Sequence, residues 1–468
     1  MGFLVRRLSL KPVGLVTPQG GDVRQVRPCQ TSCDETIPRK LAKRQPEETS
    51  LSASTYPGEE AANDHPSSVS KYGDCGSGAY CLGGCDPKWS FAIDSCLPAP
   101  VCKSKTYRWD NLDGVAPNTK YLGDASKADW VSSGEPLTSD GSLILTMAPD
   151  TVGTLMANNH YMWYGKTTAR LKTSRGKGVV TAFILLSDMK DEIDFEFVGV
   201  DLQNAQTNYY FQGITDYTNG QNASASDTFD EFHTYEIDWK PESITWSIDG
   251  KPVRVKKRSE TFNKTSNQYA YPQTPSRVQL SLWPAGLPSN GEGTIEWAGG
   301  LVDWNHEDIK NHGYYYALFD EVTVECYDPP KDAKVEGSKS YIFTDEKGTE
   351  DTVKITNKNT VLKSFLGNGR DTDKDYPSAS GTRRPSQTSD LAVVPGLSGA
   401  GPGADGNRGD SDGSDGGSPN GGNRPNPTDF SQGGDRGNES SGASPQNEQV
   451  LKGSLFAVLV ALVVLVTM

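Results

Sequence analysis

The middle of this chain, residues 103–330, is predicted to form an all-β sandwich or jelly roll. Short runs rich in β-branched and aromatic residues alternate there with turn residues such as Gly, Pro, Asn and Asp. No long run repeats its apolar residues at the period of a helix. Many short strands separated by regular turn signals are typical of β-sandwiches and jelly rolls.

The predicted strands follow one another along this region. In chain order they are Ser142–Ala148, Tyr161–Thr173, Gly178–Ser187, His233–Trp239, Glu242–Asp249, Arg277–Trp283 and Ala317–Tyr327. Asp249-Gly250 is a tight-turn signal, after which the chain resumes as KPVRV, so a hairpin is expected at this point.

The other segments differ in composition from this domain. Residues 1–66 are polar, mixed in charge and without pattern, which predicts a disordered N-terminal segment. Residues 331–441 are predicted to be a linker and a flexible stalk, because Gly, Ser, Asp, Pro and Asn dominate from about Asp371 onward. A short stretch after Lys331 can still pack on the β domain.

Residues 67–102 form a cysteine-rich segment. Eight cysteines occur in the chain, and five of them fall here, namely Cys75, Cys81, Cys85, Cys96 and Cys102. A disulfide-stapled extracellular segment is favoured, since so small a segment cannot build a sufficient core. A zinc site is disfavoured, because no His lies within the cluster and paired C-x₂-C spacings are absent. We expect neither a metal nor a cofactor.

The C-terminus carries the pattern of a glycolipid-anchor signal. Small residues Ser441-Gly442-Ala443 precede a polar spacer and the apolar run Leu455–Met468. This order is typical of a GPI signal, so residues 442–468 are expected to be removed when the anchor is attached. The protein is then expected to be secreted and held at the plasma membrane or cell wall. A single tail-anchored span is the alternative.

The net charge of −14 argues against a nucleic-acid partner, because phosphate binding depends on Lys and Arg. An acidic protein can still bind neutral polymers such as polysaccharides. Trp and Tyr, on which sugar rings stack, are frequent in the middle of the chain. We expect a monomer.

The segment Asp191–Gly199, DEIDFEFVG, contains the candidate catalytic residues. Side chains alternate between the two faces of a strand, so Glu192, Asp194 and Glu196 share one face and Ile193 and its apolar neighbours share the other. Three like charges in a row destabilise a sheet and raise one another's pKa. A solvated charged face would normally include Lys or Thr, so a catalytic role is favoured.

Paired carboxyl groups are what retaining glycoside hydrolysis needs, one as nucleophile and one as acid/base. A third acid between them can orient the nucleophile. Positions four apart on a flat strand lie about 13 Å apart at Cα, whereas retaining carboxyl groups lie about 5–5.5 Å apart. The strand is therefore expected to curve, with both Glu side chains leaning over Asp194.

Several long motifs in order resemble the fungal Crh family of cell-wall transglycosidases, in glycoside hydrolase family sixteen. These are the ExDxE pattern within SDMKDEIDFEFVG, then TNYYFQG, RVQLSLWPAG and GTIEWAGGLVDW, across roughly residues 72–330. The resemblance implies a concanavalin-like β-jelly roll with a concave cleft. It implies Glu192 as nucleophile, Asp194 as auxiliary acid and Glu196 as acid/base. It also implies chitin as donor, with chitin or β-glucan as acceptor.

Sugar binding is expected from the strand that contains Gln279, Ser281 and Trp283, which alternation places on one face. By the same resemblance, Gln279, Trp283 and Thr294 would contact chitin, together with Glu196. A core role for Trp283 is the alternative. Three further aromatic residues are weaker candidates, namely Tyr209, Tyr210 and Trp297.

The cysteine-rich segment, as SKYGDCGSGAYCLGGC, resembles part of a hevein-like chitin-binding module. Tyr72 and Tyr80 match positions of stacking aromatics in that family, whereas Asp74 stands where another aromatic is usual. Upstream paired cysteines of that module are absent from the matching region. Chitin binding by this segment is therefore an open expectation.

Two other functions remain open from the sequence. One is a plain hydrolase of chitin or β-glucan. It would use the same covalent intermediate, and would differ only in that water rather than a sugar hydroxyl reaches that intermediate. The other is a non-catalytic wall lectin, which the intact acidic triplet disfavours because binding alone does not require it.

Overall fold

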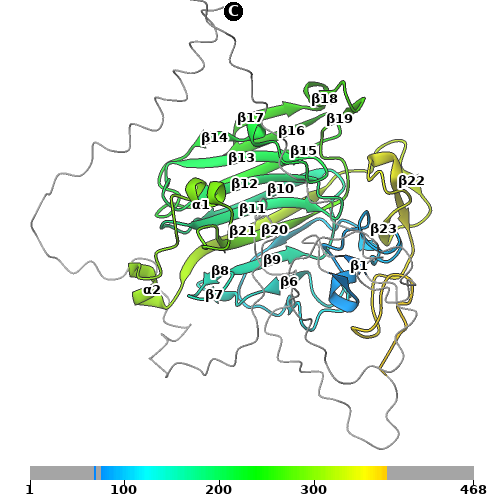
Figure 1. The fold of residues 1–468 in the computed structure, drawn as a ribbon, viewed down its shortest axis with the longest axis horizontal. Helices are drawn as coiled ribbons and strands as arrows, with labels where there is room; N and C mark the ends of the chain where they lie inside the picture. Colours follow the sequence, from blue (N-terminus) through cyan, green and yellow to red (C-terminus); the bar gives the residue numbers. More distant parts are fainter. Residues whose placement is uncertain (1–67, 70–74, 377–468) are drawn as a thin grey trace, which may run out of the picture. The chain divides into compact units, whose positions relative to one another are not determined.

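Alternation of apolar side chains produces two sheets of eight strands that pack face to face (Figure 1). The structure is a computed structural model that describes residues 68–69 and 75–376. The first sheet, called here the β10 sheet, contains β17 (Lys251–Lys257), β16 (Ser243–Ile248), β15 (His233–Trp239), β10 (Gly165–Lys172), β21 (Tyr315–Cys326), β8 (Ser142–Met147) and β7 (Leu137–Ser139), with β4 (Lys105–Tyr107) paired to β21.

The second sheet, called here the β12 sheet, carries the acidic strand. Its order is β14 (Gln221–Ser224), β13 (Asn204–Tyr210), β12 (Glu192–Val198), β11 (Val179–Ser187), β20 (Ser276–Pro284), β9 (Thr154–Asn158), β6 (Trp130–Ser133) and β5 (Val115–Pro117). Neighbours pair antiparallel except β5 and β6. The all-β prediction is confirmed, and the predicted strands match β8, β10, β11, β15, β16, β20 and β21, with small differences in their bounds.

Short elements complete the described part of the chain. They are α1 (Glu292–Trp297), α2 (Glu307–His312), the turns of 3₁₀ helix η2 (Gly78–Cys81), η3 (Tyr217–Asn219), η4 (Arg258–Thr261) and η5 (Glu350–Thr352), and the strand pairs β1 (Ser68–Val69) with β2 (Cys75–Gly76) and β18 (Phe262–Asn263) with β19 (Gln268–Tyr269). Within these residues no helix is long and apolar enough to cross a membrane. The expected anchor signal lies outside them.

The hairpin between β16 and β17 forms at the predicted turn. Asp249 and Gly250 have φ values of 50° and 74°, and Ile248 pairs with Lys251 across the turn. Positive φ at both central residues is required by the two-residue turn whose twist suits a hairpin, which explains the Asp-Gly sequence.

The core lies between the two sheets and contains the apolar face of β12. Ile193, Phe195 and Phe197 are buried there. The Phe195 ring lies 6.5 Å from that of Phe183 on β11 and 5.3 Å from that of Tyr235 on the opposite sheet. Burying each such side chain contributes about 1.5–3 kcal/mol, so the strand that carries the acids is held in place from its apolar side.

Residues 331–376 are not the linker that was predicted to begin at residue 331, and the stretch after Lys331 packs on the β domain, which the sequence left open. Residues 331–376 contain β22 (Lys334–Val335), β23 (Ser340–Phe343) and β24 (Val353–Thr356), which form a sheet with β3 (Ala99–Pro100). Tyr341, Val353 and Ile355 belong to the main core. The apolar runs in this stretch are too short to predict strands from the sequence. The stalk beyond 376 lies outside the described residues.

The cysteine-rich segment is joined to the β domain. Its two described disulfides are Cys85–Cys96, with Cα atoms 5.7 Å apart, and Cys102–Cys326, with Cα atoms 6.0 Å apart. Cys102–Cys326 connects the end of the segment to the last residue of β21. The prediction of a disulfide-stapled segment is confirmed, and the segment shares a sheet and a disulfide with the rest of the fold. Tyr72 lies outside the described residues.

Replacing both Cys102 and Cys326 with Ser is expected to destabilise the fold more than replacing Cys85 and Cys96. The first pair is separated by 224 residues and the second by 11, and a longer closed loop restricts the unfolded chain more. We expect losses of about 5 and about 3 kcal/mol. Denaturant unfolding of both double variants would measure them. A larger loss from the short loop would contradict this explanation.

Candidate active site

Three carboxyl groups on β12 point away from the core, as alternation predicts. Glu192, Asp194 and Glu196 pair on one side with Tyr210, Asn208 and Gln206 of β13, and on the other with Leu186, Ile184 and Ala182 of β11. Side chains of directly paired residues project from the same face of a sheet. The acids therefore lie in a row with a polar strand on one side and an aliphatic strand on the other.

The three acids are almost completely shielded from solvent. Their exposed fractions are 5% for Glu192, 0% for Asp194 and 9% for Glu196. Burial raises the pKa of Asp194 to about 7, although interactions with Glu192, Arg254 and the Asn208 backbone lower it in part. Burial, followed by the nearby charge of Asp194, raises the pKa of Glu196 well above its usual value. Glu196 is thus suited to hold a proton at neutral pH.

The backbone of β12 is also fixed from the opposite sheet. Trp246, which is fully buried on β16, donates a hydrogen bond from Nε1 to the carbonyl oxygen of Asp194 at 3.0 Å. The Arg254 guanidinium lies 4.6 Å from the centre of the Trp246 ring. A carbonyl at the middle of the acidic row is therefore tied to the core.

Asp191 connects the start of β12 to two neighbouring segments. Its carboxylate accepts hydrogen bonds from the backbone N–H groups of Gln212, Gln273 and Thr274, at 2.9–3.0 Å, and from the Thr274 hydroxyl at 2.6 Å. Burial raises the pKa of Asp191 to about 6, an effect that these donors reduce. Because Asp191 directly precedes Glu192, this arrangement positions the end of the acidic row.

Gln279 and Trp283 lie on the predicted face. In β20, Gln279 pairs with Ile184, which pairs in turn with Asp194, so Gln279 is two strands away from the central acid. Trp283 pairs with Val180, one step beyond the row of Glu196. Thr294 lies separately on α1 and is half-buried. The fold thus brings Gln279 and Trp283 onto the acidic face of the β12 sheet.

The Trp283 ring is buried, with 1% exposed. It forms a small cluster with Val180, Ala285 and Ala298, and its centre lies 6.2 Å from the ring of Trp297. The structure therefore gives Trp283 a packing role on the acidic face. Its contact with sugar stays a prediction.

The three weaker aromatic candidates for sugar binding lie in different surroundings. Tyr209 packs in the main core, whereas Tyr210 stands opposite Glu192 on the acidic face. Trp297 donates a hydrogen bond from Nε1 to Oε1 of Gln206, which stands opposite Glu196, at 2.8 Å. Trp297 thus contacts a residue next to the acid/base candidate.

Two polar residues beside the acids, Gln206 and Asn208, were not predicted from the sequence. Both lie on β13 and pair with the acids, and alternation in the run NAQTNYY could have indicated them once the pairing with β12 was known. The positioning role of Asp191 could not be predicted from the sequence, because its hydrogen-bond partners at 212 and 273–274 are distant along the chain. Among the described residues no group of His, Cys, Asp and Glu is arranged to hold a metal ion.

Comparison with known proteins matches residues 124–299 to glycosyl hydrolases family 16. Crh-like protein 2 of Aspergillus fumigatus is 56% identical over 85% of this chain and 91% of its own length. Congo red hypersensitive protein 2 of Saccharomyces cerevisiae is 45% identical over 66% of this chain and 68% of its own length. A solved structure described as Crh5 transglycosylase in complex with NAG shows 30% identity and a TM-score of 0.47, over 58% of this chain and 99% of that one.

Glu196→Gln is expected to stabilise the protein at neutral pH and to change little near pH 4. The folded state keeps the Glu196 proton to a higher pH than the unfolded chain does, so this group lowers stability as pH rises from the ordinary Glu pKa through the raised one. Gln removes that effect. The melting temperature should rise by about 2–4 °C for each 1 kcal/mol gained.

Thermal denaturation at the two pH values would measure this effect. Glu325→Gln, an exposed carboxylate on β21, is the matched control. An equal change at both pH values for Glu196→Gln would show that the raised pKa is not the cause.

Proposed function

Since the chain belongs to the Crh-like proteins, within glycosyl hydrolases family 16, we propose that it is a retaining transglycosylase that moves chitin onto chitin or β-glucan acceptors and so cross-links the cell wall. The observation that carries this proposal is the row of three buried carboxyl groups on one face of β12. Retention needs two of these groups in different protonation states, and the third can separate their roles.

In the first step, the Glu192 carboxylate attacks the anomeric carbon and forms a glycosyl ester as the glycosidic C–O bond breaks. Glu196 donates its proton to the departing oxygen, so that the leaving chain departs as a neutral alcohol. The raised pKa of Glu196 supports this role. Asp194, between the two, orients the nucleophile.

In the second step, Glu196 accepts a proton from the hydroxyl of an acceptor sugar. The resulting oxygen attacks the anomeric carbon and displaces Glu192, which restores the β configuration and both protonation states. If water takes the place of the acceptor, the same steps give hydrolysis. Transfer therefore depends on which hydroxyl reaches the intermediate.

Chitin is proposed as the donor, with contacts from Gln279, Trp283, Thr294 and Glu196. Support comes from the family resemblance and from the position of Gln279 and Trp283 on the acidic face. A purified protein incubated with chitin oligomers and a labelled glucan acceptor should give larger labelled products. Shortened chitin oligomers without labelled product would instead indicate a plain hydrolase.

A secreted, lipid-anchored location is also proposed, supported by the sequence pattern of residues 441–468. Deleting Leu455–Met468 should release the protein into the medium, because the anchor is attached only when the apolar tail is present. Immunoblotting of cells and medium would measure the distribution. Retention of the truncated protein with the cells, as before, would contradict the proposal.

The roles of Glu192 and Glu196 can be distinguished with azide and a β-linked donor that carries a good leaving group. In Glu196→Ala, Glu192 still forms the intermediate, and azide, which needs no base, should give the β-glycosyl azide. In Glu192→Ala, azide should attack directly and give the inverted α-azide. NMR of the products would determine the configuration.

Glu192→Gln and Glu196→Gln should each abolish transfer to natural acceptors while the fold is kept, whereas Glu325→Gln should leave transfer unchanged. The same azide configuration from both alanine variants would disprove the assignment of roles, even if both residues proved essential.

A further inference from the structure

The turn between β11 and β12, residues 187–191, leads directly into the acidic row. The Asp191 N–H donates to the Ser187 hydroxyl and the Ser187 N–H donates to the Asp191 carbonyl, both at 2.9 Å. Lys190 has a φ of 64°, a conformation that residues other than Gly, Asn and Asp rarely adopt. Because Glu192 is the next residue, the conformation of this turn determines where the proposed nucleophile begins its strand.

Residues 83–86 of the cysteine-rich segment, called here the latch, contact this turn at two points. Gly84 donates its N–H to Oδ1 of Asp188 at 2.9 Å, and Oδ2 of Asp86 lies 2.8 Å from the Lys190 ammonium. Asp86 and Asp188 are 2% and 5% exposed. Salt screens such partly buried pairs much less than exposed ones. The turn is therefore held by one hydrogen bond and one ion pair from a segment about 100 residues away.

A third contact joins the latch to β20. Arg277 donates from Nη2 to the carbonyl oxygen of Gly83 at 2.8 Å. Arg277 pairs with Leu186, which pairs with Glu192, so Arg277 lies on the acidic face in the row of the proposed nucleophile. A Cβ atom at residue 83 would lie 2.4 Å from Nη1 of Arg277 and would displace the guanidinium. Gly83 thus permits the latch to approach β20 closely.

The latch is itself fixed before it meets the turn. Cys85, in the middle of the latch, forms the disulfide with Cys96. Oδ1 of Asp86 accepts hydrogen bonds from the backbone N–H groups of Lys88 and Trp89, at 3.0 and 3.3 Å. The other oxygen of this carboxylate, Oδ2, is the one that contacts the turn. Groups that are ordered in advance lose little freedom when they bind their partners.

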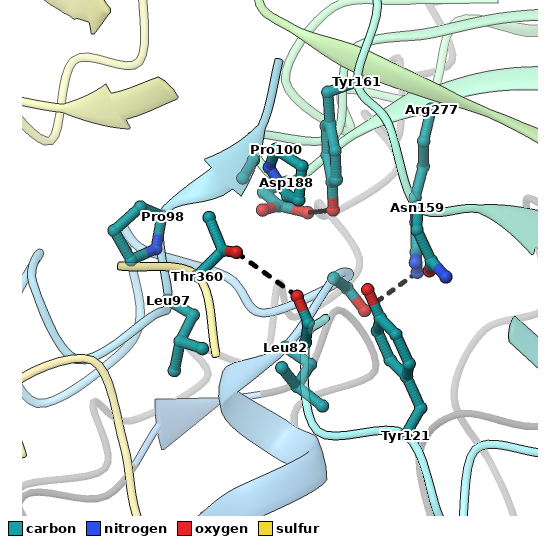
Figure 2. A pocket seen from close by; sticks show the side chains of 13 residues that line it. Leu82, Leu97, Pro98, Pro100, Tyr121, Asn159, Tyr161, Asp188, Arg277 and Thr360 are labelled. Atoms are coloured by element: carbon teal, nitrogen blue, oxygen red, sulfur yellow. Dashed lines mark hydrogen bonds between the residues drawn. The ribbon is translucent and has the colours of Figure 1, made fainter. Parts of the chain in front are cut away.

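The Asp188 carboxylate is also held from inside the β domain. Tyr161 donates its hydroxyl to Oδ1 of Asp188 at 2.8 Å, and Figure 2 shows this hydroxyl directed at the carboxylate. Burial raises the pKa of Asp188 to about 6, although the charge of Arg277 and the hydrogen bonds from Gly84 and Tyr161 oppose the rise. Without the Gly84 N–H, this buried carboxylate would lose one of the donors that stabilise its charge.

Attachment of the cysteine-rich segment does not require the latch. The disulfide Cys102–Cys326 and the pairing of β3 with β23 already join this segment to the β domain. The latch contacts fall instead on the turn that leads into the acidic row. Their position favours a role in the reaction over a role in attachment.

We propose that the latch positions the β11–β12 turn and, through it, the nucleophile Glu192, with Asp86 and Lys190 as positioning residues. This rests on the roles of the carboxyl groups in the proposed function. A nucleophile must be held close to its attack geometry, and a misplacement of about 1 Å can cost about 10²-fold in rate. Glu196 lies four residues further along β12, so a loosened turn displaces the nucleophile more than the acid/base. The latch therefore acts on the first step, formation of the glycosyl ester.

The test uses Lys190→Met, which removes the charge and keeps an unbranched side chain, and Asp86→Asn, which keeps the shape of the carboxylate. With chitin oligomers that carry an aryl leaving group, single-turnover release of the aryl alcohol measures the first step. Each variant should lower the maximal rate about tenfold, part of the loss expected from a full 1 Å displacement. The half-saturating concentration should not change.

Three further results are expected if the latch acts on the nucleophile. The double variant should lose no more than the worse single variant, because both changes break the same contact. The loss should be equal for good and poor leaving groups, since proton donation by Glu196 is intact. Lys190→Arg, which keeps the charge, should recover most of the rate.

Lys240→Met is the matched control, because Lys240 forms an ion pair of 2.6 Å with Asp238 of the β10 sheet. It should leave the rate unchanged. Thermal denaturation establishes that each variant is folded at the temperature of the assay.

Hydrogen–deuterium exchange is a second measurement that needs no turnover. The backbone N–H groups of residues 187–192 should exchange faster in both latch variants than in the parent chain, and Lys240→Met should not change them. Unchanged exchange there, an unchanged rate in the folded variants, or a loss that disappears with a good leaving group would each overturn the proposal. A parent chain that releases no aryl alcohol would count against the proposed function, and exchange would then decide whether the latch holds the turn.

Discussion

Burial of three neighbouring carboxyl groups on a single strand is the constraint on which the rest of this structure depends. Glu192, Asp194 and Glu196 are each less than one tenth exposed, and such groups resist ionisation together. That resistance is useful to a retaining enzyme, which needs one carboxylate and one carboxylic acid in the same site. It also destabilises the strand that carries them, so the strand must be held by other contacts.

Those contacts come from every side of β12. Its apolar face packs in the core against Phe183 and Tyr235, and Trp246 binds the carbonyl of Asp194 from the opposite sheet. At the start of the strand, the Asp191 carboxylate accepts hydrogen bonds from the backbone N–H groups of three residues. The acids are therefore placed by groups that do not themselves react, which is how a site gains fixed geometry.

The cysteine-rich segment has a different position from the one its composition suggested. It resembled a separate chitin-binding module, yet it contributes β3 to a sheet with β23 and β24 and covers part of the acidic face. Its peptide at Gly83-Gly84 is held between Arg277 and Asp188.

The sequence by itself determined the acidic row and the strands around it, because alternation with a period of two is a local property that a single strand displays. The hairpin at Asp249-Gly250 was equally local. The tertiary structure alone decided which groups meet across long separations: Asp191 with residues 273–274, Cys102 with Cys326, and residues 79–83 with β6 and β9. It also decided that Trp283 is buried and that residues 331–376 form strands. These outcomes depend on pairing and packing between distant segments, for which one sequence carries no periodic signal.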